Sequence, residues 1–190
     1  ITNINYNFLH DSVNRKNDRK NYSIFAITKR SGGKRFIHAV NGNLFDIQKY
    51  INSEILQKIT PHPSSFAFHS SGGIRKCAFM HCGCKWLLKF DLKDFFYTIS
   101  EIDIFNVFQK LGYKKLLSFE LARLCTTTKL PREKKEYIKN INNTNYIYFK
   151  PYSTQEYLGV LPQGAPTSPM LSNLVCEKLD ELFYLYAQSN

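Results

Sequence analysis

Apolar side chains recur every three to four residues in four stretches of the chain, and this spacing predicts amphipathic helices. A capping-box pattern, Ser100-x-x-Asp103, marks the start of the second stretch, and Gly112 follows its end. Ser168 is the expected N-cap of the last stretch, with Pro169 in its first turn. The predicted helices cover residues 44–59, 101–111, 115–127 and 168 onward.

Short stretches elsewhere carry the apolar patterns that are typical of β-strands. Residues 22–27 and 34–40 flank the turn sequence TKRSGG, which predicts a basic antiparallel hairpin. Residues 86–90 form an apolar run directly before Asp91, so we expect a buried strand that ends on a carboxylate. Residues 146–149 are a weaker candidate for a strand.

Residues 159–174, GVLPQGAPTSPMLSNL, hold two glycines and three prolines in sixteen residues. Such a composition predicts a loop of fixed shape, and here it leads directly into the last predicted helix. A strand that ends on Asp91 and faces this loop would be a catalytic layout. These two stretches therefore carry the chemistry that the sequence suggests.

Composition narrows the classes of protein to consider. A chain of 190 residues that is 43% hydrophobic can bury one sizeable core, with or without a smaller lobe. Its 26 Lys and Arg against 15 Asp and Glu give a net charge of +11, which favours a polyanionic partner but also fits a membrane-surface binder. No apolar run approaches the roughly 20 residues that cross a bilayer, and no signal-peptide pattern opens the chain. We expect a soluble, cytoplasmic protein without a membrane partner.

The five cysteines do not suggest a disulfide framework, because their number is odd and three of them are crowded together. Cys77, His81, Cys82 and Cys84 invite a zinc interpretation, but their spacing matches no usual zinc knuckle. We expect reduced thiols in the core of a half-buried helix instead.

Two segments are not part of the main predicted helices and strands. Residues 1–20 are polar and rich in Asn, with a basic run between Arg15 and Lys20, and we expect a solvated arm. Residues 129–157 are charged and rich in Asn and Tyr, and they are longer than a simple connection. A template contact and an insertion are both open for this second segment.

Two stretches resemble the motifs of a known family. FDLKDFF, at residues 90–96, resembles motif A of reverse transcriptases. LPQGAPTSPMLSNL, at residues 161–174, resembles their motif B in the form shared by bacterial retron-type and group II intron enzymes. Residues 77–81, CAFMH, are similar to the Asn-Ala-x-x-His signature of retron-type enzymes, except that Cys77 replaces the Asn. The resemblance covers the chain from about residue 22 to its end.

This resemblance implies an α+β fold, namely the fingers and part of the palm of a right-hand polymerase, with an antiparallel sheet backed by helices. Residues 1–85 would form an N-terminal arm and the fingers, and residues 86–190 would form the palm with motifs A and B. Residues 129–157 would be an insertion or a return to the fingers.

The resemblance also assigns roles to individual residues. Asp91 would be the first carboxylate ligand of the catalytic metal ions, and the Leu92 carbonyl would be a backbone ligand. Lys29 and Arg35, on the predicted hairpin, would grip the triphosphate of the incoming nucleotide, for which Arg offers bidentate contact and Lys a point charge. Asp94 is expected to have a structural or capping role.

Further roles concern the sugar and base of the nucleotide. Phe96 lies five residues after Asp91, where the family carries the ring that excludes a 2′-hydroxyl; core packing is the other interpretation of this ring. Gln163 and Gly164 would contact the templating base and the nucleotide, because an amide can bond a base edge and a glycine allows close backbone approach. The residues expected to shape and orient motif B are Pro162, Pro166, Ser168 and Asn173.

The function implied is an RNA-directed DNA polymerase that transfers deoxynucleotides to a primer 3′-hydroxyl with two Mg²⁺ ions. Its partners would be an RNA template, a DNA or RNA primer and deoxynucleoside triphosphates. The similarity at residues 77–81 favours a retron or a phage-defence role, with a non-coding RNA partner, over intron mobility. A non-catalytic nucleic-acid-binding module of the same shape is the alternative, and an RNA-dependent RNA polymerase is disfavoured by Phe96.

The Tyr-x-Asp-Asp motif of the family, which supplies further metal carboxylates, does not occur in these 190 residues, and no region corresponds to the thumb. The chain begins at Ile1 and ends at Asn190 inside a predicted helix. We therefore expect a piece of a longer polymerase that is inactive by itself.

Overall fold

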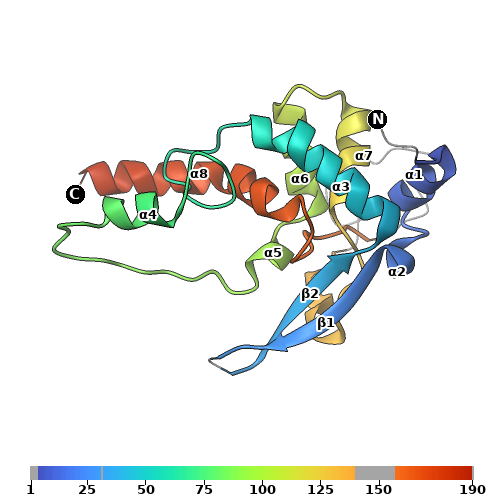
Figure 1. Ribbon diagram of the computed structural model, residues 1–190, viewed down its shortest axis with the longest axis horizontal. Coiled ribbons are helices and arrows are strands. Elements are labelled where there is room, and N and C mark those ends of the chain that lie inside the picture. The colour runs from blue at the N-terminus through green and yellow to red at the C-terminus, as the bar shows by residue number, and fades with distance from the viewer. Residues whose placement is uncertain (1–3, 31, 140–156, 190) are drawn as a thin grey trace.

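The computed structural model describes residues 4–30, 32–139 and 157–189. In Figure 1 the hairpin of β1 and β2 projects downward from a group of helices, and α8 extends from the same group to the left, where it lies above α4. The elements in chain order are α1 (Tyr6–Val13), α2 (Asp18–Asn21), β1 (Tyr22–Thr28), β2 (Lys34–Val40), α3 (Gly42–Glu54), η1 (Leu56–Lys58), α4 (Ile74–Met80), α5 (Phe95–Thr98), α6 (Glu101–Lys110), α7 (Lys115–Cys125), η2 (Arg132–Tyr137) and α8 (Ser168–Ser189).

The basic hairpin is confirmed. β1 and β2 pair antiparallel in a register that runs from Tyr22 opposite Val40 to Thr28 opposite Lys34. Gly32 and Gly33 both have positive φ, and they allow the tight reversal that the turn sequence predicts. Apart from isolated bridges, β1 and β2 make up the one sheet of the described residues.

The four predicted helices are also confirmed, with differences at their ends. The capping box at the start of α6 is present, since the Ser100 amide donates to Asp103 Oδ2 over 2.7 Å and the Asp103 amide donates to Ser100 Oγ. Gly112 follows α6 with φ +91°. The helix predicted for residues 44–59 is instead α3 followed by a 3₁₀ turn, because regular α-helix stops at Glu54.

The main core lies between α3, α6, α7 and the first turns of α8. Apolar residues from all four helices form one cluster, and a smaller cluster gathers around Tyr97 and Val160. Residues of the main cluster with no exposed surface include Leu56, Ile104, Phe108, Phe119, Met170 and Leu171. The helical spacing of apolar residues in the sequence thus corresponds to real buried faces.

The N-terminal segment is not the solvated arm that its polar composition predicts. It folds into α1 and α2, α1 packs against α7, and Arg15 is only 5% exposed. The basic run divides, because Lys16, Arg19 and Lys20 stay exposed while Arg15 turns inward. A buried guanidinium is tolerated here because Glu101, far along the chain, supplies the opposite charge.

The strand predicted for residues 86–90 does not form. This segment is extended and exposed, with Trp86 90% and Phe90 76% exposed. A strand needs a neighbouring strand for its backbone hydrogen bonds and a packed layer for its apolar face. Within the ranges that the structure describes, no strand lies beside residues 86–90.

The cysteine-rich segment also differs from expectation. α4 buries none of its residues, and Cys82 and Cys84 are exposed beyond its end, so the thiols are not in a core. All five cysteines are free. Among the described residues, no three His, Cys, Asp or Glu side chains are grouped so that they could hold a metal ion.

The candidate strand at residues 146–149 lies outside the described residues. So does most of the charged segment 129–157, although its first part includes η2. No helix in the described ranges combines the length and the apolar character needed to cross a membrane.

Candidate active site

A pocket of about 470 Å³ lies between the hairpin, the segment that leads into α5, the η2 turn and the motif B loop. It brings together residues that are far apart in sequence, including six that were predicted as site residues. The lining residues are Lys29, Lys34, Arg35, Phe36, Asp91, Leu92, Lys93, Asp94, Phe95, Phe96, Tyr97, Lys134 and Gln163.

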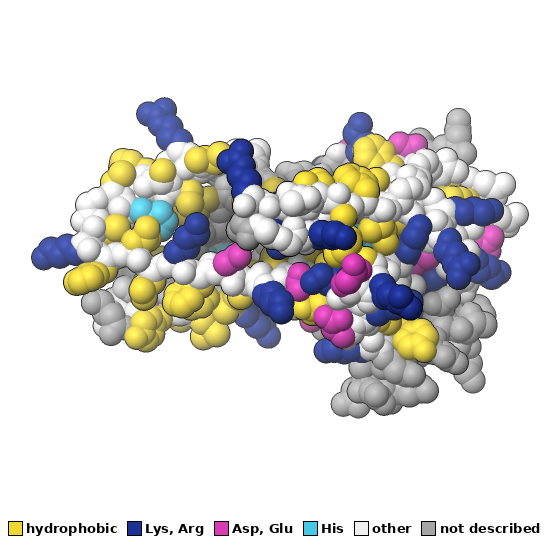
Figure 2. Space-filling model, turned by 90° about the horizontal axis from the view of Figure 1, so that it is seen from below, with side chains coloured by type: hydrophobic (Ala, Val, Ile, Leu, Met, Phe, Trp, Pro, Cys, Tyr) yellow, Lys and Arg dark blue, Asp and Glu magenta, His cyan; other side chains and the backbone are white. Residues whose placement is uncertain are grey.

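The charge of this pocket is predominantly positive. Three basic residues come from the hairpin, Lys93 comes from the segment before α5, and Lys134 comes from η2. The acids are Asp91 and Asp94, and Asp94 already forms an ion pair with Lys134. On the face seen in Figure 2, Lys and Arg side chains are most frequent from the middle of the molecule to its right side, with fewer Asp and Glu among them. A site of this kind suits a phosphate-bearing ligand that is bound together with a cation.

The hairpin is joined to the motif B loop by a backbone hydrogen bond. The His38 amide donates to the Gln163 carbonyl over 2.7 Å, which holds Gln163 at the edge of the pocket. Gly164 follows with φ +109°, and a Cβ atom there would lie 2.9 Å from Ile37 Cγ2 and 3.1 Å from His38 O. Both the backbone conformation and the close approach of β2 therefore require glycine at this position.

Side chains from the start of α8 fix the shape of the same loop. The Ser168 hydroxyl donates to the Pro162 carbonyl over 2.6 Å, so it closes the loop and is not the helix N-cap, because α8 already begins at Ser168. The Asn173 amide donates to the Ala67 carbonyl over 2.7 Å. Pro166 lies between Pro162 and Ser168 and removes one degree of backbone freedom. Ser168 and Asn173 thus hold the loop and the segment around Ala67 in place, and neither lines the pocket.

Backbone hydrogen bonds join the segment that follows motif A to the entry of motif B. The Leu161 amide donates to the Ile99 carbonyl over 2.9 Å, and the Glu101 amide donates to the Gly159 carbonyl over 2.8 Å. Val160 also exchanges two hydrogen bonds with Thr127, each of 3.0 Å. The end of α5 and the entry to motif B therefore keep a constant spacing.

Glu101 is the centre of a buried charge network at this junction. Its carboxylate contacts the Arg15 and Arg123 guanidinium groups at 2.6 Å each and accepts a hydrogen bond from the Gly159 amide at 2.9 Å. Burial alone would raise the pKa of Glu101, but the two arginines hold it below its ordinary value. Gly159 is needed for this packing, because a Cβ there would lie 2.9 Å from Thr126 Oγ1 and even closer to Arg15.

The sequence pattern does not indicate this network. Arg15 and Glu101 are 86 residues apart, and both occur in contexts that have simpler interpretations, a basic run and the first turn of a helix. The one signal available is a glycine before the motif B prolines, which indicates close packing but not its partner.

Asp94 has a structural role, as expected, but not by a side-chain cap. It precedes α5 with φ +52° and makes no capping hydrogen bond to the helix. Its Oδ2 accepts from Lys134 Nζ over 2.6 Å and from the Tyr137 hydroxyl over 3.2 Å. The hydrogen bond from Lys134 is the main cause that lowers the pKa of Asp94.

Asp91 and Leu92 are both exposed and line the pocket. A carboxylate and a backbone carbonyl are the oxygen ligands that Mg²⁺ prefers. These residues match a magnesium site in kind but not in number, since the described residues contain no complete group of ligands.

Comparisons with known proteins identify one family for this chain. Residues 27–189 match the family model described as reverse transcriptase (RNA-dependent DNA polymerase). The chain is 31% identical over 170 residues to the retron Ec86 reverse transcriptase of Escherichia coli, and the aligned region covers 88% of this chain and 44% of that protein. It is 32% identical over 172 residues to the retron Mx65 reverse transcriptase of Myxococcus xanthus, and this aligned region covers 90% of this chain and 38% of that protein.

The chain thus spans less than half the length of these two curated relatives. The family model covers most of the chain and both motifs, in agreement with the resemblance seen in the sequence. The chain belongs to the reverse transcriptase family, and its relatives include bacterial retron reverse transcriptases.

Proposed function

We propose that this chain is part of an RNA-directed DNA polymerase that adds deoxynucleotides to a primer 3′-hydroxyl on an RNA template. The observation that carries the proposal is the pocket in which Asp91, Phe96 and Gln163 meet a set of basic side chains. Each of these residue types is suited to contact a different part of a nucleoside triphosphate or its metal ions. Membership of the reverse transcriptase family supports the same conclusion.

The triphosphate would be bound by the hairpin side of the pocket. Lys29 and Arg35 lie near the two ends of the turn and both line the pocket. Arg35 can bind two phosphate oxygens at once, and Lys29 supplies a compact positive charge. Lys34 lines the pocket beside them and extends this positive surface.

Asp91 and the Leu92 carbonyl would face the phosphates from the opposite wall. Divalent cations bound there would lower the pKa of the attacking hydroxyl and stabilise the charge on the leaving group. Asp91 is the carboxylate for this role, because Asp94 is already bound to Lys134 and Tyr137. We propose that further carboxylates from the longer protein complete the site, with Mg²⁺ as the ion.

The remaining contacts would select the sugar and base. Phe96 lines the pocket and is partly buried against the core, which suits a ring that lies under the sugar and leaves no room for a 2′-hydroxyl. Gln163 is held in place through its own carbonyl, so its side-chain amide can meet a base edge. Gly164 lets β2 approach this loop closely.

In this proposal the hairpin belongs to the fingers, within residues 1–85, and residues 86–190 belong to the palm. The η2 turn supports a return of the segment 129–157 toward the fingers, since Lys134 lies in the pocket beside the hairpin residues. The retron enzymes among the relatives favour a retron role with a non-coding RNA partner.

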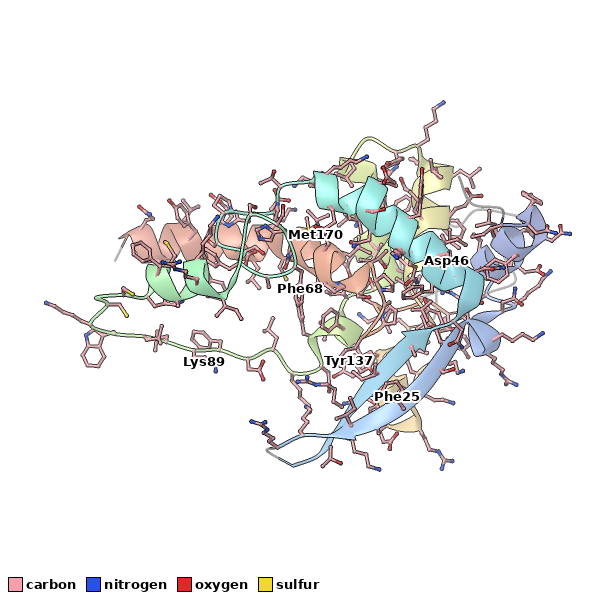
Figure 3. All side chains as sticks on the ribbon, in the orientation of Figure 1. Phe25, Asp46, Phe68, Lys89, Tyr137 and Met170 are labelled. Carbon is pink, nitrogen blue, oxygen red and sulfur yellow. The ribbon has the colours of Figure 1, made fainter. Side chains whose placement is uncertain are left out.

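The test is primer extension on an RNA template with Mg²⁺ and deoxynucleotides, using the full-length protein that contains this chain. Asp91→Asn should abolish synthesis while RNA binding persists, because the change removes a metal ligand and leaves the basic surface intact. Asp46→Asn, at an exposed position on α3 outside the pocket, is the matched control and should keep full activity (Figure 3). Equal activity of the Asp91 variant and the unsubstituted protein would refute the assignment of Asp91.

The alternative is a non-catalytic nucleic-acid-binding module. Asp91 argues against it, because an exposed carboxylate in a basic pocket weakens phosphate binding unless a cation is bound as well. RNA binding without any synthesis by the full-length protein would favour the module. The same assay on the 190-residue chain alone should show no synthesis, and activity there would contradict the need for further carboxylates.

A further inference from the structure

The single helical turn that carries Phe96 is held mainly by contacts from outside it. α5 has four residues and follows the exposed, extended segment that begins near Trp86. A helix of one turn is not stable by itself, because its few hydrogen bonds do not offset the conformational entropy that the backbone loses. Asp94, just before α5, is in the left-handed region at φ +52°. The position of Phe96 therefore depends on what packs against this turn.

The η2 turn supplies those contacts. Asp94 Oδ2 accepts hydrogen bonds from Lys134 Nζ at 2.6 Å and from the Tyr137 hydroxyl at 3.2 Å. The Asp94 and Lys134 side chains are only 16% and 17% exposed, so their ion pair is better shielded from solvent than most surface pairs. Asp94, Lys134 and Tyr137 are called the α5 clamp below.

Aromatic contacts hold the other side of α5. The Tyr97 ring lies 6.0 Å from the Tyr137 ring and 5.7 Å from the His38 ring, measured between centroids. Tyr137 thus contacts α5 twice, once through its hydroxyl on Asp94 and once through its ring on Tyr97. Figure 3 shows the labelled Tyr137 where α5 approaches the hairpin.

Phe96 lies between the two anchored residues of this turn. Its neighbour Tyr97 is held by ring contacts with Tyr137 and His38, and Asp94, two residues before it, is held by the ion pair. Phe96 itself packs partly on the core, with its ring 5.5 Å from that of Phe95, and it also lines the pocket. A rotation of the turn would therefore move the Phe96 ring relative to the sugar of a bound nucleotide.

We propose that the α5 clamp positions the Phe96 ring and thereby sets the selectivity of the enzyme for deoxynucleotides over ribonucleotides. The clamp residues are positioning residues, since they would act on the sugar through Phe96. This inference rests on the proposed polymerase function and on the proposed role of Phe96, and it gives the start of the 129–157 segment a function at the active site.

A different role for Lys134 must be separated from this one. Lys134 lines the pocket, so it could bind the triphosphate directly. A phosphate contact does not distinguish deoxy- from ribonucleotides, because both carry the same triphosphate. The ratio of kcat/KM for the two nucleotide types therefore reports the position of the ring and cancels any uniform loss of phosphate binding.

The experiment measures this ratio by primer extension with the full-length protein. Lys134→Met removes the cation of the clamp, and Tyr137→Phe removes one hydroxyl without a change of charge. Lys135→Met is the matched control, because it removes the same charge from the neighbouring exposed position, which lies outside the pocket. Lys134→Arg keeps the ion pair with Asp94 and should therefore keep the deoxy-to-ribo ratio of the unsubstituted protein. Phe96→Val tests the ring itself.

We expect Lys134→Met to lower the deoxy-to-ribo ratio of kcat/KM by roughly 3- to 10-fold, and Tyr137→Phe to lower it less. The effects are moderate because both residues would act on the sugar only through Phe96. Lys135→Met and Lys134→Arg should leave the ratio unchanged, and Phe96→Val should lower it most.

Each other outcome has a definite meaning. A lowered ratio in Phe96→Val with an unchanged ratio in Lys134→Met and Tyr137→Phe would overturn the role of the α5 clamp but keep the role of the Phe96 ring. An unchanged ratio in Phe96→Val would overturn the role of the ring in sugar selection, and the role of the clamp with it, even though synthesis continues. A full-length protein that makes no DNA would overturn the proposed function itself.

Discussion

At the scale of single residues, the close approach of β2 to the motif B loop depends on Gly164. The glycine has φ +109°, and any side chain would meet Ile37 and His38 of β2. Gln163 lies next to it, and its carbonyl accepts the hydrogen bond from the His38 amide. A change at Gly164 should therefore reach the pocket through Gln163.

We expect Gly164→Ala to raise KM for the incoming nucleotide by roughly tenfold, since left-handed strain together with a clash costs about 1–3 kcal/mol. Primer extension at varied nucleotide concentration measures the effect. Gly112→Ala is the matched control, because Gly112 also has positive φ but a Cβ added there would have no atom within 4 Å. It should lower Tm and leave KM unchanged, and equal effects of the two variants on KM would contradict the role of close approach.

At the scale of elements, the charge network around Glu101 joins the N-terminal segment, α6, α7 and the entry to motif B. Arg15 also donates to the carbonyls of Thr126 and Arg123, at the C-terminal end of α7. Asp18 accepts from the Thr128 amide and hydroxyl, each at 3.0 Å. These contacts make the N-terminal segment part of the scaffold that holds the candidate active site.

Glu101→Gln should destabilise the protein by about 3–5 kcal/mol, because it leaves two buried arginines without their carboxylate. The free energy of unfolding in urea, measured on the full-length protein, gives this value. Glu177→Gln is the matched control, since Glu177 pairs with Lys110 at an exposed site and such pairs contribute at most about 1 kcal/mol. Similar losses of unfolding free energy in the two variants would show that the buried network contributes no more to stability than an exposed ion pair.

At the scale of the whole molecule, the hairpin meets the helical core around His38. This side chain has no exposed surface, and its Nε2 lies 3.1 Å from the Lys129 carbonyl oxygen. Its ring contacts those of Tyr22 and Tyr97. Burial is the main cause that lowers the pKa of His38 to about 4, so the imidazole is neutral in the folded protein at pH 7.

The stability of the protein should therefore fall as the pH is lowered from 6.5 toward 4. In this range the unfolded chain binds a proton at this histidine and the folded protein does not, so acid favours unfolding. The loss would reach at most about 3 kcal/mol, since one pKa unit corresponds to about 1.4 kcal/mol.

Urea unfolding at about pH 6.5 and about pH 5 tests this, because both values lie above the ordinary pKa of Asp94 and Glu101. His38→Phe should flatten the dependence on pH, whatever its stability at neutral pH. His81→Gln, at an exposed position, should keep the dependence of the unsubstituted protein. A flat profile for the unsubstituted protein would contradict the lowered pKa of His38.

Much of the fold follows from local patterns. The hairpin, the capping box of α6 and the four apolar helices are confirmed because each depends on residues close together in sequence, such as Ser100 and Asp103. The strand predicted for residues 86–90 is wrong for the opposite reason. Their apolar run indicates a buried strand, but burial and pairing depend on distant partners, and the described residues supply none there.

The candidate site was likewise predicted only in part from the sequence. The residue types and spacing of motifs A and B are sufficient to indicate the reverse transcriptase family and to name Asp91, Phe96, Gln163 and Gly164. The roles of these residues stay predictions. That Lys29 and Arg35 line one pocket with Asp91, Phe96 and Gln163 required the tertiary structure. The hairpin reaches the loop through a hydrogen bond between His38 and Gln163, which are far apart in the chain.

The sequence by itself determined most of the local elements, the family and the residue types of two motifs, because these depend on neighbouring residues and short spacings. Only the tertiary structure decided that Arg15 is buried against Glu101 and that Lys134 reaches Asp94. Both are ion pairs between segments 86 and 40 residues apart. A charged side chain has the same sequence signature on the surface and in a buried pair, and its partner is chosen by how the chain packs.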